Sequence, residues 1–135
     1  PDLLAEYGYD YTLDFGMMDD QPFWCETAPS NKDTPEPMLC LPYPIELNDQ
    51  PAMVFRRDTP DQFFSAAIDQ FDEMRRSSDT YPQIFVVSLH SFIAGQPYRL
   101  KHLRRLLEHI QAHETDVWVT RPGEVARHYR QVSGD

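Results

Sequence analysis

Basic residues and long apolar runs are both scarce in this sequence, and each shortage excludes a class of protein. Its 12 lysine and arginine residues face 22 aspartate and glutamate residues, which leaves a formal net charge of −10. Such a chain repels phosphate backbones, so we expect no nucleic-acid partner. No apolar run approaches the roughly 20 residues that cross a bilayer, and no basic segment followed by an apolar stretch opens the chain. We expect a soluble, cytoplasmic segment with no membrane contact.

Cysteine is also rare, with only Cys25 and Cys40 in the chain. Two thiols are too few for a disulfide scaffold in a chain of this length. They flank a proline-rich segment, so a bond between them is conceivable. In a cytoplasmic protein we expect both thiols to be reduced.

Apolar and aromatic residues are plentiful enough for a core. Hydrophobic residues make up 41% of the 135 residues and aromatic residues 13%, which suits one compact domain. The chain opens on Pro1 with a segment that already reads as helix, because proline is common at the first helical position. We therefore expect a piece cut from a longer protein.

Hydrophobic periodicity predicts a series of alternating strands and helices. Helical spacing is clear from Thr59 to Arg76 and from Arg99 to His113, and Gly8 and Pro122 mark the end of a first helix and the start of a last one. Four strands are expected, at residues 9–13, 38–41, 83–90 and 116–119. Between them, residues 14–37 show no period and predict a long irregular loop.

The order of these elements predicts an α/β fold. Buried apolar strands followed by helices are typical of a parallel sheet with right-handed crossovers, either open or closed into a barrel. With about three strong strands, the chain fits the C-terminal half of a (β/α) barrel.

Reactive groups in such folds project from the C-terminal ends of the strands, which directs attention to His90. It ends the run Gln83–His90, and an imidazole suits general acid or base catalysis near neutral pH. The alternative, a structural histidine at a strand end, stays open.

The strand end at Pro42–Pro44 supplies further polar candidates. Tyr43, Glu46, Asn48 and Asp49 could hold a polar substrate, although a solvated turn explains the last three equally well. Arg99, in the first turn of a helix, could bind a carboxylate or an oxyanion.

Two groups of possible metal ligands lack the spacing that a metal site needs. The acidic residues Asp10, Asp14, Asp19 and Asp20 do not follow a calcium-loop pattern. His109 and His113 lie four residues apart without the glutamate that a zinc-protease helix carries between them. We predict no metal site in this chain.

Five stretches of the sequence carry a joint signal, and the most informative is Ser88-Leu-His-Ser-Phe-Ile-Ala-Gly-Gln-Pro-Tyr-Arg-Leu100. The others are Leu3–Tyr9, Asp19–Pro22, Leu41–Asp49, and Asp116–Thr120 with Glu124. Together they resemble the NodB-type polysaccharide deacetylases, in the branch with allantoinase-like and peptidoglycan-deacetylase-like proteins, and the first is similar to the late Leu-His motif of the family.

The resemblance implies a distorted (β/α) barrel and a hydrolase of non-peptide carbon–nitrogen bonds. His90 would be the acid that protonates the leaving nitrogen, with Tyr43, Glu46, Asn48, Asp49 and Arg99 on the substrate side. A divalent metal, such as zinc, would bind in the N-terminal half of the same barrel, the partner that this chain lacks. The substrate would be an N-acetylated sugar or a small amide, and the whole protein a homo-oligomer.

Two rival functions are compatible with the same motifs. One is an allantoinase-like enzyme that opens a cyclic amide, and the other a non-catalytic carbohydrate-binding or assembly module on the deacetylase scaffold. Ser91 departs from the family pattern, because relatives often carry proline after the histidine, and the change bears on how rigidly His90 is held.

Overall fold

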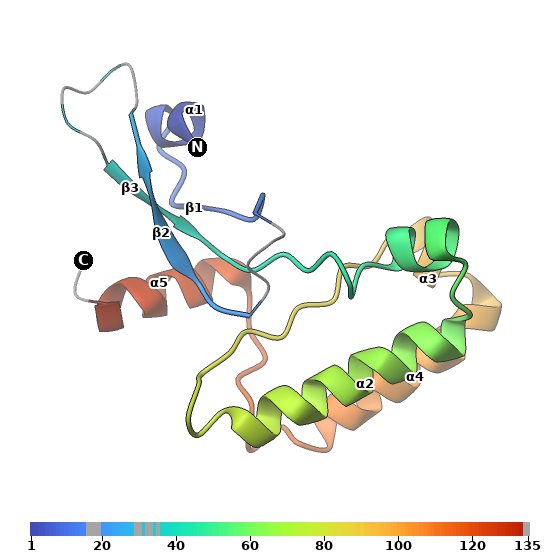
Figure 1. The fold of residues 1–135 in the computed structure, drawn as a ribbon. Helices are drawn as coiled ribbons and strands as arrows, with labels where there is room; N and C mark the ends of the chain where they lie inside the picture. The colour runs from blue at the N-terminus through green and yellow to red at the C-terminus, as the bar shows by residue number, and fades with distance from the viewer. Residues whose placement is uncertain (16–19, 29–30, 32–33, 35, 134–135) are drawn as a thin grey trace. The chain divides into compact units, whose positions relative to one another are not determined.

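The computed structural model describes residues 1–15, 20–28, 31, 34 and 36–133, and Asp19 of the predicted acidic group lies outside these ranges. The chain divides into two compact units. Unit 1 comprises residues 1–43 and 120–135, and unit 2 comprises residues 44–119 (Figure 1). In the described part of the chain, no helix combines the length and the apolar character needed to span a membrane.

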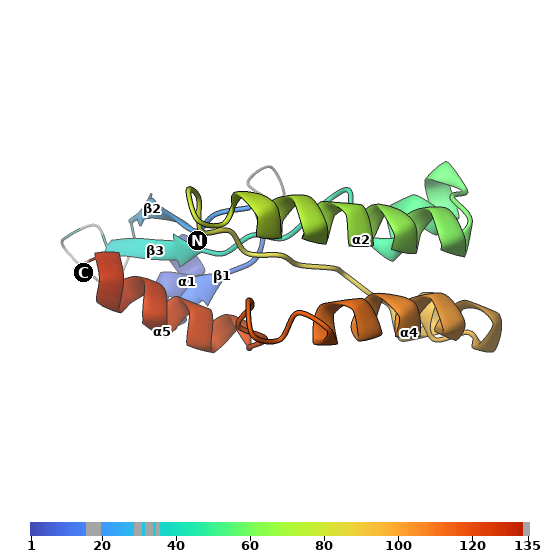
Figure 2. The ribbon, with the colours of Figure 1, turned by 90° about the horizontal axis from the view of Figure 1, so that it is seen from below.

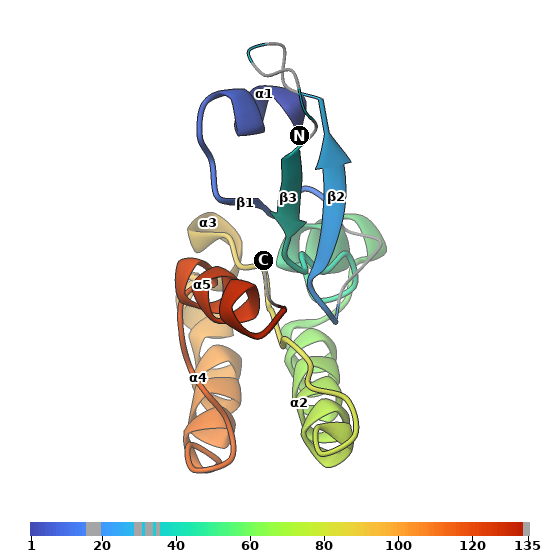
Figure 3. The same ribbon diagram turned by 90° about the vertical axis from the view of Figure 1, so that its left-hand side faces the viewer.

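Unit 1 is built on a small mixed sheet. Helix α1 (Asp2–Glu6) leads through Gly8, whose positive φ of 76° favours glycine, into strand β1 (Tyr11–Thr12). Strands β2 (Phe23–Thr27) and β3 (Glu36–Cys40) complete the sheet in the order β1-β3-β2 (Figure 3). Strand β3 runs parallel to β1 and antiparallel to β2.

Helix α5 (Pro122–Ser133) packs on this sheet through its apolar stripe. Its buried Ala126 lies in one cluster with Leu39 and Leu41, and Trp24 of β2 joins the same cluster. The prediction of a last helix after Thr120 is thereby confirmed.

Unit 2 is mainly helical. Helix α2 (Pro60–Ser77) begins at a capping box, in which the Thr59 hydroxyl accepts from the Gln62 N–H and the Gln62 side chain accepts from the Thr59 N–H. Helix α4 (Pro97–Gln111) lies beside α2 (Figure 2). Both helices form where the periodicity predicts them. The remaining helical segments, η1 (Gln50–Arg56), a π-helix, and the short α3 (Ser91–Ala94), were not predicted.

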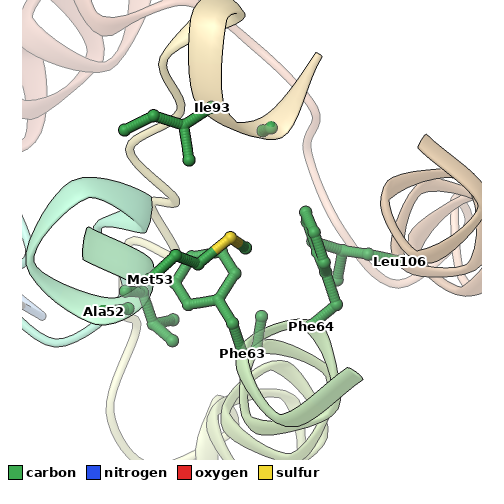
Figure 4. Close-up of a cluster of buried hydrophobic side chains, with 9 residues drawn as sticks. Ala52, Met53, Phe63, Phe64, Ile93 and Leu106 are labelled. Atoms are coloured by element: carbon green, nitrogen blue, oxygen red, sulfur yellow. The ribbon is translucent and has the colours of Figure 1, made fainter. Parts of the chain in front are cut away.

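The core of unit 2 joins these four helical segments. Figure 4 shows Phe63 and Phe64 of α2 directed toward Met53 of η1, Ile93 of α3 and Leu106 of α4. Phe64 is fully buried, and removing such a ring costs about 3–5 kcal/mol in typical cores. The core therefore fixes the short η1 and α3 segments against the long helices.

Three predicted elements differ from the structure. Residues 83–90 and 116–119 form no strand, and β2 lies inside the predicted irregular loop 14–37. The run Gln83–His90 is apolar enough for a strand, but a strand needs hydrogen-bonded neighbours. Within the described residues it has only one parallel bridge, between Ser88 and Asn48. The α/β character of the prediction is confirmed, whereas the parallel sheet is present only in part.

Candidate active site

The bridge between Asn48 and Ser88 brings together the two polar sequences identified at the strand ends. The Ser88 N–H donates to the Leu47 carbonyl (2.8 Å), and the Asp49 N–H donates to the Ser88 carbonyl (3.0 Å). Asp49 follows Asn48 by one residue and His90 follows Ser88 by two, and the two segments run parallel. As a result, the side chain of Asp49 meets that of His90.

Asp49 and His90 form a tightly bonded pair. His90 Nδ1 lies 2.6 Å from Asp49 Oδ1, and Asp49 Oδ2 accepts from the backbone N–H groups of His90 (2.9 Å) and Ala94 (3.2 Å). A carboxylate only accepts hydrogen bonds, so Nδ1 carries the proton that faces it. The second ring nitrogen, Nε2, is then the atom that exchanges a proton with a reacting group.

Burial separates the roles of the two side chains. Asp49 has no exposed surface, whereas the His90 side chain is 31% exposed. A buried carboxylate is tolerated when donors surround it, and here three N–H groups do so. The aspartate therefore orients the imidazole. The structure pairs Asp49 with His90 and Ala94, and a contact of Asp49 with substrate stays a prediction.

Helix α3 hydrogen-bonds to the backbone carbonyl of the histidine. His90 is the residue before α3, and its carbonyl accepts from the N–H groups of Ile93 and Ala94 (both 2.9 Å). The turn closes at Gly95, where a Cβ atom would lie 2.3 Å from the Ser91 carbonyl oxygen. Glycine is required there by this close approach, which explains the single glycine of the motif.

Arg99 forms a hydrogen bond to the same turn. Its Nη1 donates to the Ile93 carbonyl (2.9 Å), and its guanidinium lies over the Tyr98 ring, 5.0 Å from the ring centroid. Its buried Nε has no hydrogen-bond acceptor among the described residues. Arg99 thus supports α3, the helix that carries His90 at its start.

The other predicted substrate-side residues have local partners or lie elsewhere. Glu46 is exposed and pairs with Arg56 (3.2 Å), and the Asn48 side chain accepts from the Gln50 N–H (3.1 Å). Tyr43 is half-buried at the end of a segment of unit 1. For Tyr43, Glu46, Asn48, Asp49 and Arg99, a contact with substrate stays a prediction.

A second histidine–carboxylate pair provides a useful contrast. His109 Nε2 lies 2.7 Å from Asp72 Oδ1 on the surface shared by α4 and α2, and Asp72 is 45% exposed. Solvent screens this pair far more than it screens the buried Asp49. The pair of His109 and Asp72 is therefore a surface contact.

Among the described residues, no three His, Cys, Asp or Glu side chains converge as metal ligands.

Comparisons with known proteins agree with the motifs around His90. No family model matches the chain. Over 81% of its length it is 31% identical to a Schizosaccharomyces pombe protein named as a polysaccharide deacetylase, and over 88% it is 26% identical to the peptidoglycan deacetylase of Helicobacter pylori. Two solved structures, Puue allantoinase and a Pseudomonas aeruginosa protein described as a polysaccharide deacetylase, match 96% of the chain with TM-scores of 0.80, at 31% and 30% identity.

The chain spans only part of each of these proteins. It covers 35% and 48% of the two curated relatives and 41% of each solved chain. The fold of the neighbours is of the NodB type, with mixed α and β content. The chain is therefore a partial-length relative of the polysaccharide deacetylases and of the allantoinase that shares their fold.

Proposed function

We propose that the protein carrying this chain is a hydrolase of non-peptide carbon–nitrogen bonds, with His90 as its general acid. The observation that carries the proposal is the pairing of His90 Nδ1 with the fully buried Asp49, at 2.6 Å. The names of the relatives support a deacetylase reaction on a polysaccharide or peptidoglycan. An N-acetylated sugar is accordingly the first substrate class.

The geometry supports proton delivery by His90. When a tetrahedral intermediate collapses, the nitrogen leaves as an amine only if it receives a proton. With Nδ1 held by Asp49, the imidazolium gives up the proton on Nε2. Asp49 stabilises the positive charge on the ring before the transfer and keeps the ring plane fixed, as the carboxylate does in other acid–base pairs.

The remaining parts of the reaction come from outside this chain. We propose that the chain is the C-terminal half of a distorted (β/α) barrel, in which the N-terminal half supplies the base that activates water. The described residues do not fit a divalent metal, because no three ligands converge. If zinc takes part, its ligands belong to that other half.

A second candidate is ring opening of a cyclic amide. The match to Puue allantoinase favours it, with a TM-score of 0.80 over 96% of the chain. The same acid serves both reactions, because each releases a nitrogen that requires a proton. The two candidates therefore differ in the shape of the substrate site, not in the role of His90.

The test is hydrolysis by the full-length protein of an N-acetylglucosamine oligomer and of allantoin, with and without added zinc. We expect turnover of one substrate, and a fall in kcat of about 10²–10⁴-fold in His90→Gln. His109→Gln is the matched control, since it alters a second carboxylate-paired histidine of similar exposure (28% against 31%). It should retain wild-type turnover.

Unchanged turnover in His90→Gln would remove this residue from the mechanism. Binding of the oligomer without turnover of either substrate would instead favour the carbohydrate-binding module as the function.

A further inference from the structure

The two cysteines of unit 1 lie in contact, at a site unrelated to His90. Cys25 in β2 and Cys40 in β3 are both free thiols, and their Sγ atoms are 3.2 Å apart. A disulfide bond is about 2.05 Å long, so the two sulfur atoms must come closer together before they can bond. The contact is closer than an ordinary packing contact between two sulfur atoms.

The strand register explains why these sulfur atoms meet. Cys25 is paired with Met38, and Cys40 with Phe23, so the two cysteines are diagonal neighbours. Side chains two residues apart lie on the same face of a sheet. Trp24 and Leu39, one residue away on each strand, belong instead to the cluster with α5. Cys25 and Cys40 therefore share the opposite face.

The two thiols differ in their access to solvent. Cys25 is half-buried, whereas Cys40 has no exposed surface. An oxidant in solution thus meets Cys25 first, and Cys40 lies behind it as the second thiol. This is the arrangement of an attacking and a resolving cysteine.

We infer that Cys25 and Cys40 form a dithiol site that low-molecular-weight disulfides, such as oxidised glutathione, convert into a bond between β2 and β3. The Cys25 thiolate attacks one sulfur of the oxidant, whose S–S bond breaks and releases one glutathione thiolate. Cys40 then loses its proton and attacks the Cys25 sulfur, which releases the second glutathione. Two protein thiols are oxidised, and one glutathione disulfide is reduced to two glutathione molecules.

The experiment is incubation of the full-length protein with oxidised glutathione, followed by thiol blocking, non-reducing digestion and mass spectrometry. In the wild-type protein we expect a peptide that links Cys25 to Cys40 and weighs less than the two reduced peptides by two hydrogen atoms. Glutathione on Cys25 should be transient and should give way to the linked peptide faster at higher pH, because burial raises the pKa of the resolving Cys40 thiol. In Cys40→Ala, the resolving thiol is absent, and glutathione should remain bound to Cys25.

In Cys25→Ala, Cys40 should stay unmodified, because it is buried and the oxidant does not reach it. Persistent glutathione on Cys25 of the wild-type protein, or the absence of the linked peptide, would overturn the inference. The wild-type result stands without the variants, so a variant that fails to fold does not obscure it. As a second measurement, the linked protein should unfold several degrees higher than the reduced protein, because the bond restricts the unfolded chain.

Discussion

Asp49 is the residue whose surroundings in the structure differ most from those that the sequence indicates. It follows Asn48 in what reads as a solvated turn, yet it has no exposed surface and binds three N–H groups of His90 and Ala94. Its two oxygens have separate partners: Oδ1 holds the imidazole, and Oδ2 holds the backbone on which the imidazole is mounted. A change at Asp49 therefore disturbs both the tautomer of His90 and its position.

Asp49→Asn tests this positioning role. Asparagine replaces one acceptor oxygen with an NH₂ group, which faces either the Nδ1 proton or the backbone N–H groups. We expect kcat to fall by about 10²–10⁴-fold with a smaller change in KM, as when a triad aspartate is replaced. The pH profile of kcat should also shift, which a purely structural defect would not produce.

The matched control is Asp72→Asn, which alters the carboxylate of the surface pair and should leave kcat unchanged. In the double variant Asp49→Asn with His90→Gln, the loss should not exceed that of His90→Gln alone, because the two residues act as one unit. Additive losses would contradict the assignment.

Cys40 makes a second prediction at the level of single residues. Burial, reinforced by the contact with Cys25, raises the pKa of the Cys40 thiol to about 12. In the unfolded chain a thiol has a pKa of about 8.5. Between this pH and the pKa of the folded thiol, the native state therefore binds more protons than the unfolded state. The free energy of unfolding should therefore be unaffected below about pH 8 and fall by up to about 1.4 kcal/mol per pH unit above about pH 9.

Urea unfolding of the reduced protein at a series of pH values measures this dependence. Cys40→Ala should lose the part of the alkaline slope that the thiol causes. An identical slope in both proteins would show that Cys40 ionises as readily in the folded state as in the unfolded one.

Among the elements, the turn from His90 to Gly95 decides how the acid is held. Ser91 is the first residue of α3, where the backbone N–H has no acceptor within the helix. His90, just before it, has φ −105° and ψ 128°. These angles are the ones that a residue preceding proline adopts.

Ser91→Pro should therefore be accepted without strain. Proline at this position restricts the unfolded chain, and we expect the free energy of unfolding to rise by about 0.4–1 kcal/mol. Because the geometry of His90 is already compatible with proline, kcat should stay within about twofold of wild type. Thermal unfolding and steady-state kinetics measure the two effects.

A loss of stability in Ser91→Pro would mean that the Ser91 N–H has a role in the native protein. Gly95→Ala offers the opposite case at the other end of the turn. There the added Cβ would meet the Ser91 carbonyl oxygen at 2.3 Å, so destabilisation is expected.

In the molecule as a whole, the apolar run before His90 lacks the surroundings of a buried strand. Ile84, Phe85, Val86 and Val87 are only partly buried and form no strand, although Phe85 packs edge-on against Phe71 of α2. Backbone N–H and C=O groups in such a run require hydrogen-bond partners. If the chain is half of a barrel, the neighbouring strands of the other half supply them.

Hydrogen exchange tests this proposal directly. The amides of residues 84–87 should exchange fast in the 135-residue chain by itself and slowly in the full-length protein, because ladder hydrogen bonds protect amides. Amides inside α2 serve as the internal reference. Equally fast exchange of residues 84–87 in both proteins would contradict the barrel.

Much of the local structure could be predicted from the residues alone, because its causes are local. The capping box of Thr59 and Gln62, the apolar stripes of α2 and α4, and the position of Gly8 each depend on residues within a few positions of one another. The same holds for His90, which stands out as an ionisable residue at the end of an apolar run.

The pairings between distant residues could not be predicted in this way. That Asp49 lies against His90 is seen only in the folded chain, and a bond between Cys25 and Cys40, conceivable from the sequence, gains a 3.2 Å contact across β2 and β3 only there. These pairs join residues 41 and 15 positions apart. They depend on strand register and on the bridge between Asn48 and Ser88, which no local periodicity encodes, because a register is chosen by the packing of both partners together.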